Sequence, residues 1–153
     1  MNNFLNDLPG LKKRSLLVVE DSDADFDALK RLLKKIGFKN PIYRVEDGED
    51  AIDFLFNLGE YTDEEIAPKP TLVLLDLNLP GTDGREVLAQ VKQDEELKTI
   101  PIVVFSTSPN PKDVEACYKS GANSYMLKPM KIEDLQESLE TFIVHWFEVV
   151  LLP

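Results

Sequence analysis

The chain has 153 residues, of which 43% are hydrophobic and 29% are charged, as is ordinary for a single globular domain. Its formal net charge of −11 argues against a nucleic-acid partner, because binding to a phosphate backbone depends on clustered Lys and Arg. The single cysteine, Cys117, excludes a disulfide framework and a Cys-rich zinc site. Without a leader sequence or an apolar run near the ~18 residues of a membrane span, we expect a cytoplasmic protein that does not bind membranes.

Short apolar runs alternate with helical patterns along the whole chain. The first helical pattern starts at Ser22, carries apolar residues at helical spacing and stops at Gly37. A later one starts with Asn110 and Pro111, a favourable N-cap and first helical residue. The alternation predicts one doubly wound, five-stranded parallel sheet flanked by five helices. We expect the strands at 16–20, 42–45, 72–75, 102–105 and 124–127.

Three segments lie outside this regular alternation. Residues 1–14 form a short N-terminal extension, and residues 147–153 form an apolar C-terminal extension. Residues 59–70 are acidic and contain two prolines, which indicates an insertion rather than a linker between domains. We therefore expect a single domain with no attached output domain.

Polar residues follow four of the five predicted strands at the point where each strand ends. Because ligands bind beyond the carboxyl ends of the strands in such a sheet, these side chains are expected to converge there. They are Glu20 and Asp21 after the first strand, Asp76 and Asn78 after the third, Ser106 and Thr107 after the fourth, and Lys128 with Pro129 after the fifth.

The three acids of this group indicate a divalent cation. Two carboxylates about 4 Å apart repel each other by ~4 kcal/mol at an effective dielectric constant of 20. Glu20, Asp21 and Asp76 would therefore be unfavourable together unless a cation lay among them. Oxygen ligands of this kind favour a hard ion, and Mg²⁺ commonly binds one or two carboxylates together with phosphate oxygens.

The remaining groups indicate phosphoryl transfer. Asp76 is the candidate nucleophile, because a carboxylate accepts a phosphoryl group as an acyl phosphate. Such a transfer requires mainly positioning and neutralisation of the phosphoryl oxygens. The cation would neutralise one oxygen, the Lys128 ammonium a second, and the Ser106 hydroxyl would bind a third.

The order of these residues closely resembles the receiver domain of two-component response regulators, which has a flavodoxin-like fold. The segments that carry the resemblance are 76–84, with the sequence DLNLPGTDG, and 119–129, with the sequence KSGANSYMLKP. The resemblance extends from about residue 15 to about residue 150. The insertion at 59–70 and the FIVHWF segment at 142–147 further resemble stand-alone receivers paired with phytochrome-type kinases.

The resemblance implies a role for each residue of the group. Asp76 would be phosphorylated by the phosphohistidine of a sensor histidine kinase. Asp21, Asp76 and the main-chain carbonyl of Asn78 would hold Mg²⁺, with Glu20 acting through water. Ser106 would be the switch hydroxyl and Tyr125 the aromatic side chain that moves with it. Thr107 also carries a hydroxyl that could meet the phosphate, but spacing from Lys128 favours Ser106.

The apolar C-terminal region has two interpretations. Phe142, Trp146 and Phe147 either add to the core or form an interface, since exposed apolar patches mark interfaces. Receivers commonly pair through the fourth helix, fifth strand and fifth helix, and we expect a homodimer there. His145, the only histidine, is interpreted as a packing or surface residue.

Two other functions remain as alternatives to a regulatory phosphoacceptor. A Mg²⁺-dependent phosphohydrolase of the haloacid dehalogenase type also uses a nucleophilic Asp, a Ser or Thr, and a Lys. That class expects a second Asp two residues after the nucleophile, where this chain has Asn78, and acids after the lysine rather than before it. A binding-only receiver-like domain would have lost site residues, and the sequence retains them all. We therefore expect a regulator, not an enzyme, that promotes its own phosphorylation and dephosphorylation.

Overall fold

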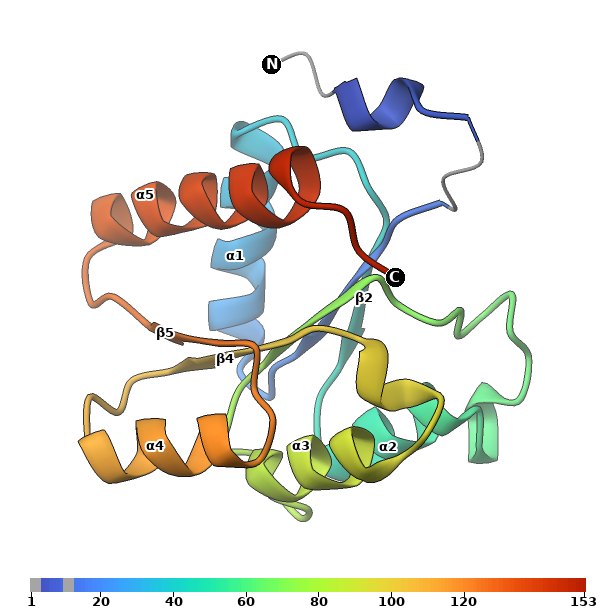
Figure 1. Cartoon of the computed structure of the whole chain (residues 1–153). Helices are drawn as coiled ribbons and strands as arrows, with labels where there is room; N and C mark the ends of the chain where they lie inside the picture. Colours follow the sequence, from blue (N-terminus) through green and yellow to red (C-terminus); the bar gives the residue numbers. More distant parts are fainter. Residues whose placement is uncertain (1–3, 10–12) are drawn as a thin grey trace.

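The computed structural model describes residues 4–9 and 13–153. Five parallel strands form one sheet, as the sequence predicts, and their order in the sheet is β2-β1-β3-β4-β5 (Figure 1). The first strand ends one residue earlier than expected and the fourth ends one residue later. The strands are β1 (Leu16–Val19), β2 (Ile42–Val45), β3 (Leu72–Leu75), β4 (Ile102–Ser106) and β5 (Ser124–Leu127).

Helices cover both faces of the sheet. In Figure 1, α1 and α5 lie on one face, and α2, α3 and α4 lie on the other. The α-helices are α1 (Asp23–Lys35), α2 (Gly48–Phe56), α3 (Gly84–Gln93), α4 (Pro111–Lys119) and α5 (Ile132–Ile143). The shorter helical segments are η1 (Phe4–Asp7), η2 (Gly59–Tyr61), η3 (Leu97–Thr99) and the π-helical η4 (Val144–Val149).

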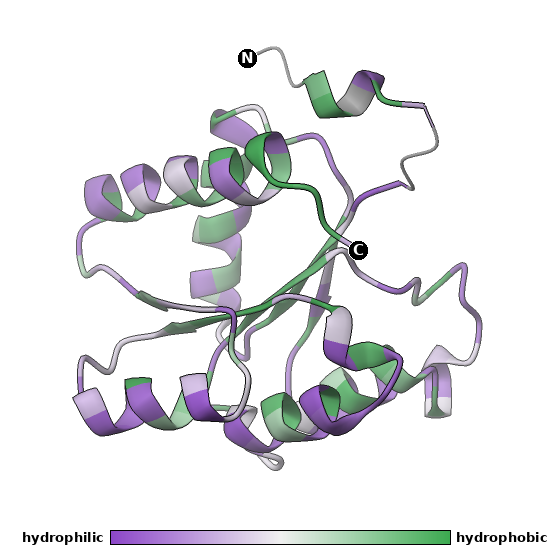
Figure 2. Ribbon diagram, in the orientation of Figure 1, coloured by the Kyte–Doolittle hydropathy of each residue, from purple (hydrophilic) through white to green (hydrophobic). Residues whose placement is uncertain are grey.

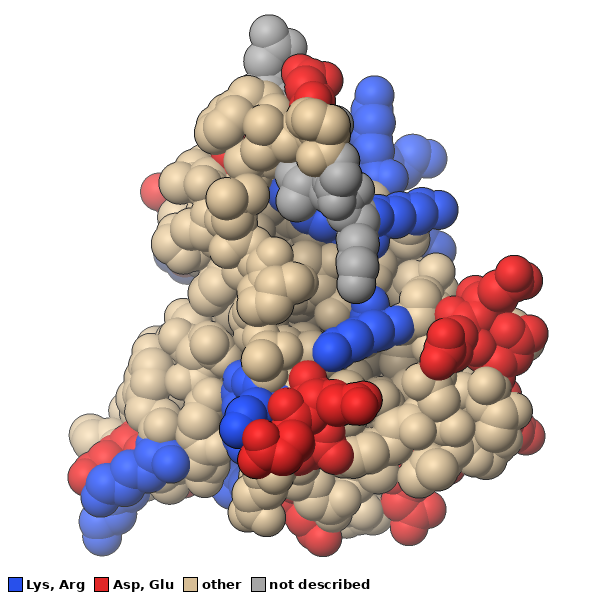
Figure 3. Space-filling view, turned by 45° about the vertical axis from the view of Figure 1, so that its right-hand side comes forward, with Lys and Arg blue, Asp and Glu red and all other residues tan. Residues whose placement is uncertain are grey.

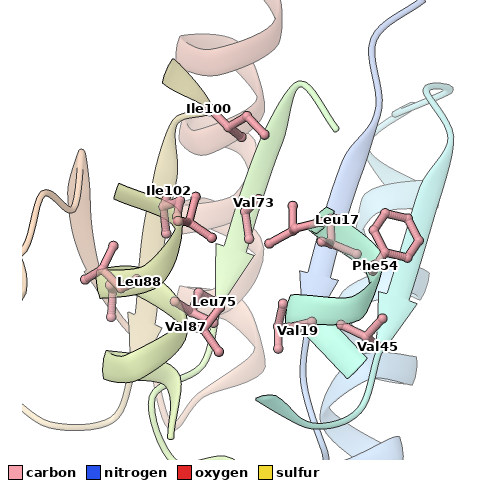
Figure 4. Close-up of a cluster of buried hydrophobic side chains, with 14 of the residues drawn as sticks. Leu17, Val19, Val45, Phe54, Val73, Leu75, Val87, Leu88, Ile100 and Ile102 are labelled. Carbon is pink, nitrogen blue, oxygen red and sulfur yellow. The ribbon is translucent and has the colours of Figure 1, made fainter. Parts of the chain in front are cut away.

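The central strands are apolar along their whole length because both of their faces are buried. In β1, Leu16 and Val18 point into the core under α1 and α5, whereas Leu17 and Val19 point into the core under α2 and α3. Figure 4 shows this second core, and Figure 2 shows the strands as an apolar layer between helices with polar outer faces. Because successive side chains of a strand point to opposite faces, one continuous apolar run contributes side chains to both cores.

The predicted helix signals act as expected. The Ser22 hydroxyl accepts a hydrogen bond of 3.2 Å from the backbone N–H of Asp25, which caps α1. Asn110 caps α4 in the same way by accepting from the backbone N–H of Lys112 at 3.0 Å. Gly37 follows α1 with φ of 86°, a conformation that favours glycine.

The 59–70 segment is folded back onto the domain. The side-chain amide of Asn57 donates to the carbonyls of Tyr61 at 3.0 Å and Ala67 at 2.9 Å. Ala67 is fully buried in the core under α2. The segment therefore has an internal anchor, although its prediction as an insertion relative to other proteins stays a prediction.

The C-terminal region is largely core. Phe142 and Phe147 are only 3% and 1% exposed, and the Phe147 ring lies 4.9 Å from the ring of Phe38. The Arg14 guanidinium donates to the Phe147 carbonyl and so links the segment before β1 to η4. The chain itself buries the rings of Phe142 and Phe147, so these two residues do not form the exposed interface that the sequence predicts. Of the three predicted interface residues, Trp146 alone is partly exposed.

Among the described residues, no helix is long and apolar enough to cross a membrane. Every peptide bond that the structure describes is trans, including the bond between Lys128 and Pro129.

Candidate functional site

The predicted site residues meet at the carboxyl edge of the sheet because the backbone ladder continues beyond the strands. The N–H of Asp76 donates to the Val19 carbonyl at 3.1 Å, and the N–H of Lys128 donates to the Ser106 carbonyl at 2.8 Å. The residues that follow β1, β3 and β5 are therefore held in register with one another. The sheet itself sets the spacing of the site.

The three acids form the cluster that the sequence predicts. One carboxylate oxygen from each of Glu20, Asp21 and Asp76 lies within 4.8 Å of the others. Glu20 and Asp76 are only 5% and 8% exposed, while Asp21 is exposed. The Oε2 atom of Glu20 is buried and accepts no hydrogen bond from the described residues. An oxygen-only donor set with one orphaned buried oxygen fits a hard divalent cation that retains water ligands.

Lys128 offsets part of the negative charge of this cluster. Its Nζ lies 2.8 Å from Glu20 Oε1 and 3.0 Å from Asp76 Oδ2, and its side chain is 15% exposed. Asp25 on α1 lies further away, at 3.7 Å. Burial acts to lower the pKa of Lys128, but its hydrogen bonds to Glu20 and Asp76 outweigh burial and raise that pKa. The Lys128 side chain therefore stays protonated at this site.

The environment separates the pKa values of the two buried carboxyls. Burial, followed by hydrogen bonding with Asp76, raises the pKa of Glu20 to about 8. Burial also opposes ionisation of Asp76, but hydrogen bonds with Glu20 and Lys128 prevail and lower the pKa of Asp76. Of the two carboxyls, Glu20 therefore holds a proton more readily, and Asp76 is the one that ionises first. The ionised carboxylate is the form that attacks phosphorus.

The backbone around Asp76 is closely packed. The N–H of Asn78 donates to Asp76 Oδ1 at 3.1 Å, which orients the carboxylate. A Cβ atom on Gly84, the first residue of α3, would lie 2.3 Å from the Asp76 carbonyl oxygen. Helix α3 therefore approaches the end of β3 as closely as it does because residue 84 has no side chain.

Ser106 and Thr107 have different surroundings. Ser106 is 1% exposed, and its Oγ accepts a hydrogen bond of 3.2 Å from the N–H of Ser108. Thr107 is exposed and lines a cavity of about 260 Å³ together with Asp76 and Lys128. Both hydroxyls lie at the end of β4 beside the acidic cluster.

Sequence reasoning missed a group of polar residues that leads from Ser106 to α4. The Tyr125 hydroxyl donates to the Ser108 carbonyl at 2.8 Å, and Ser108 Oγ lies 2.6 Å from Asp113 Oδ2. Asp113 in turn lies 3.6 Å from the Arg85 guanidinium at the start of α3. The only available signal was the polar composition of 106–113, which also fits an ordinary helix cap.

The comparisons with known proteins agree with this geometry. The family model for the response regulator receiver domain matches residues 16–140. Response regulator Rcp1 of Synechocystis sp. is 44% identical over 138 residues, which cover 90% of this chain and 92% of Rcp1.

Two solved structures are similar over nearly the whole chain. The crystal structure of the Mn²⁺-bound form of Rcp1 has a TM-score of 0.84 at 43% identity and covers 92% of this chain and 99% of that one. The phosphorylated cyanobacterial phytochrome response regulator RcpA has a TM-score of 0.86 at 37% identity, with coverages of 93% and 99%.

The chain therefore belongs to the response regulator receiver family. It is a regulatory domain of two-component phosphorelay signalling that resembles phytochrome response regulators, and its family implies a sensor kinase as partner. This assignment favours the predicted regulator over the phosphohydrolase alternative.

Proposed function

We propose that Asp76 accepts a phosphoryl group from a sensor-kinase phosphohistidine with the aid of Mg²⁺, and that this event switches a partner-binding surface. The observation that carries the proposal is the pairing of an ionised, buried Asp76 with Lys128 inside a three-acid cluster. A fixed ammonium beside an ionised carboxylate is suited to neutralising an incoming phosphoryl group.

The metal would be held by Asp21, Asp76 and the main-chain carbonyl of Asn78, with Glu20 acting through water. The orphaned Oε2 of Glu20 supports that last role, because a water on the cation would give it a partner. When bound, Mg²⁺ neutralises charge on the phosphoryl oxygens and on the attacking carboxylate.

The transfer uses groups that are already close together. One oxygen of Asp76 attacks phosphorus, the P–N bond to the donor imidazole breaks, and a P–O bond forms. Lys128 Nζ, 3.0 Å from Asp76 Oδ2, moves from the carboxylates to a phosphoryl oxygen. The site would thereby promote its own phosphorylation, and a water attacking phosphorus of the acyl phosphate would release inorganic phosphate and restore the Asp76 carboxylate.

The switch would act through Ser106. When Ser106 Oγ turns to a phosphoryl oxygen, it gives up the hydrogen bond from the Ser108 N–H. Ser108 also contacts Tyr125 and Asp113, so its movement changes the position of Tyr125 and of the start of α4. Thr107 remains close enough to the cavity to contribute a second hydroxyl.

We infer that the phosphodonor is a phytochrome-type kinase, on the strength of the likeness to RcpA and Rcp1. Apolar side chains around Lys128 suit the docking of a protein donor: Leu127, Met130 and Ile132 are 50%, 98% and 52% exposed. Nucleic acid is not expected as a partner. Acidic side chains lie beside the Lys and Arg side chains on the face in Figure 3, and the net charge is −11.

We also propose that the protein forms a homodimer whose interface consists of α4, β5 and α5. Trp146, Met126 and His145 line a groove of about 550 Å³ between β5 and α5. Light scattering should give twice the chain mass for the wild type and a lower mass for Trp146→Glu. A wild type that stays monomeric with and without phosphorylation would contradict the dimer.

The central test is the intact mass after incubation with acetyl phosphate. We expect one phosphoryl adduct that requires Mg²⁺, is absent in Asp76→Asn and persists in the matched surface variant Asp27→Asn. Removing the donor should let the adduct decay, faster with Mg²⁺ than with a chelator. An adduct that survives in Asp76→Asn would place the phosphoryl group elsewhere, and no adduct at all would support a binding-only domain.

A further inference from the structure

Arg44 lies on β2, outside the set of residues assigned to phosphoryl transfer, yet it contacts the loop that carries the predicted metal ligands. It pairs with Val18 in the parallel register, and its side chain runs toward the carboxyl end of β1. There its Nε donates to the main-chain carbonyl of Glu20 at 3.1 Å. The N–H of Glu20 donates to the Val45 carbonyl of the same strand at 3.0 Å. Both backbone polar groups of Glu20 are therefore bound to β2.

The same guanidinium also holds the start of α1. Its Nη1 lies 2.7 Å from Asp23 Oδ1, and its central carbon lies 4.7 Å from the centre of the Phe26 ring. A third, weaker contact joins Nη1 to Glu46 at 3.4 Å. Arg44 thus contacts the chain on both sides of Asp21, at Glu20 before it and at Asp23 and Phe26 after it.

Asp21 depends on this arrangement because its own side chain has no other anchor. It is exposed, and among residues 4–9 and 13–153 no hydrogen bond or ion pair to its carboxylate is seen. Its position is set by the backbone on either side. Fixing that backbone keeps its carboxylate within reach of those of Glu20 and Asp76 before any metal arrives.

The contacts of Arg44 differ in strength. The strongest are the hydrogen bond to Glu20 and the stacking on Phe26, and only an arginine can make both at once. Asp23 is 80% exposed, so its ion pair alone contributes little. The Arg44 side chain is 17% exposed, and its planar group stacks on Phe26 while it donates to Glu20. A lysine keeps the charge but loses the fork and the stacking surface.

We infer that Arg44 is a positioning residue for the divalent-cation site, holding the Glu20–Asp23 loop in its metal-binding conformation. This inference rests on the proposed metal site. It predicts that substitutions of Arg44 weaken metal binding by loosening the loop. Loss of the positive charge alone would have the opposite effect on metal affinity. Arg44→Gln removes a positive charge near a cation site, which by electrostatics alone would strengthen metal binding.

The test is a Mn²⁺ titration of the unphosphorylated protein, followed by the EPR signal of free ion. We expect Arg44→Lys and Arg44→Gln each to raise the Mn²⁺ dissociation constant on the order of tenfold, the lower end for residues that support metal ligands. Arg31→Gln is the matched control and should leave the constant unchanged. Arg31 is exposed on α1, and within the part of the chain that the structure describes its side chain makes one hydrogen bond, to the carbonyl of Asp27 in its own helix. Amide exchange at residues 21 and 22 should accelerate in the Arg44 variants alone.

Phe26→Leu provides a second variant in case the Arg44 variants fold poorly. It removes the ring under the guanidinium but leaves the charge in place, and it should weaken Mn²⁺ binding by a smaller factor. Folded Arg44 variants that bind Mn²⁺ as tightly as the wild type, or tighter, would overturn the inference and leave the metal site intact. A wild type that binds no Mn²⁺ would overturn the metal site itself and the inference with it.

Discussion

The β1–β3 side of the site and its β4–β5 side are held by different kinds of contact. On the first side, Glu20 and Asp76 are buried carboxyls balanced by Lys128. On the second, neutral groups of Ser106, Ser108 and Tyr125 form a chain of hydrogen bonds toward α4.

In the proposed function, the charged side carries out the phosphoryl chemistry and the neutral side transmits the signal. Removing one partner of a buried ion pair typically costs about 3–5 kcal/mol, whereas a neutral hydrogen bond contributes about 0.5–1.5 kcal/mol. The charged side is therefore costly to rearrange unless a new charge arrives, as Mg²⁺ or a phosphoryl group would provide. The neutral side can exchange partners at little cost, which is what a switch requires.

The largest effect is expected for Lys128→Ala, which removes the cation from the charged side. Asp76 would be left ionised and buried, and we expect the free energy of unfolding to fall by about 3 kcal/mol without Mg²⁺. Added Mg²⁺ should restore part of that loss. The measurement is urea unfolding with and without the metal.

Lys119→Ala is the control for this change. Lys119 is 74% exposed and pairs with Glu115 on α4 at 2.8 Å, so its loss should cost less than about 0.5 kcal/mol. Similar losses for the two lysines would show that the buried charges do not govern the stability of the charged side.

A smaller effect, and one that depends on pH, is expected for Glu20→Gln. The pKa of Glu20 is about 8 in the folded chain against an ordinary 4.5, so between these values the folded state binds more protons than the unfolded state. Without metal, wild-type stability should therefore fall as pH rises from 4.5 to 8. Glutamine cannot ionise, and at pH 8 the variant should be more stable than the wild type by about 1–3 kcal/mol.

Urea unfolding over this pH range checks the prediction, with the exposed Glu64→Gln as control. Mg²⁺ should stabilise the wild type at pH 8 more than it stabilises Glu20→Gln. If wild-type stability did not change between pH 4.5 and 8, the result would contradict a raised pKa for Glu20.

The smallest effect is expected on the neutral side, for Ser108→Ala. The variant loses the contact with Asp113 and should be destabilised by about 1 kcal/mol. Amide exchange at the start of α4 should accelerate, while Mg²⁺ affinity stays at the wild-type value. Ser120→Ala, at the exposed end of α4, should change neither quantity. A change in Mg²⁺ affinity in Ser108→Ala would show that the two sides are not held independently.

Much of the fold could be predicted from the sequence because its signals are local. The central strands are short, mostly apolar runs, and residues such as Ser22 and Asn110 mark helix starts by hydrogen bonding to backbone only two or three residues away. The acids and Lys128 could be placed together because a parallel sheet brings all its strand ends to one edge.

The parts that could not be predicted depend on contacts between distant residues. Arg44 lies on an edge strand, where the sequence does not show whether its side chain faces solvent or a neighbouring loop. Phe142 and Phe147 carry the same apolar signal whether they fill a core or cover a surface. Phe147, for example, packs against Phe38 and accepts a hydrogen bond from Arg14, and both of these residues lie more than 100 residues earlier in the chain.

Lys128 already binds two carboxyl groups, and this should couple phosphoryl binding to metal binding. In the structure its Nζ is shared between Glu20 and Asp76, so an incoming phosphoryl group must compete with both of them. A divalent cation among the acids would release the ammonium and raise the affinity for phosphoryl oxygens. By thermodynamic reciprocity, an oxyanion that takes Lys128 raises the affinity for the cation by the same factor. We therefore expect the domain to respond to the joint presence of metal and phosphodonor more steeply than to either alone.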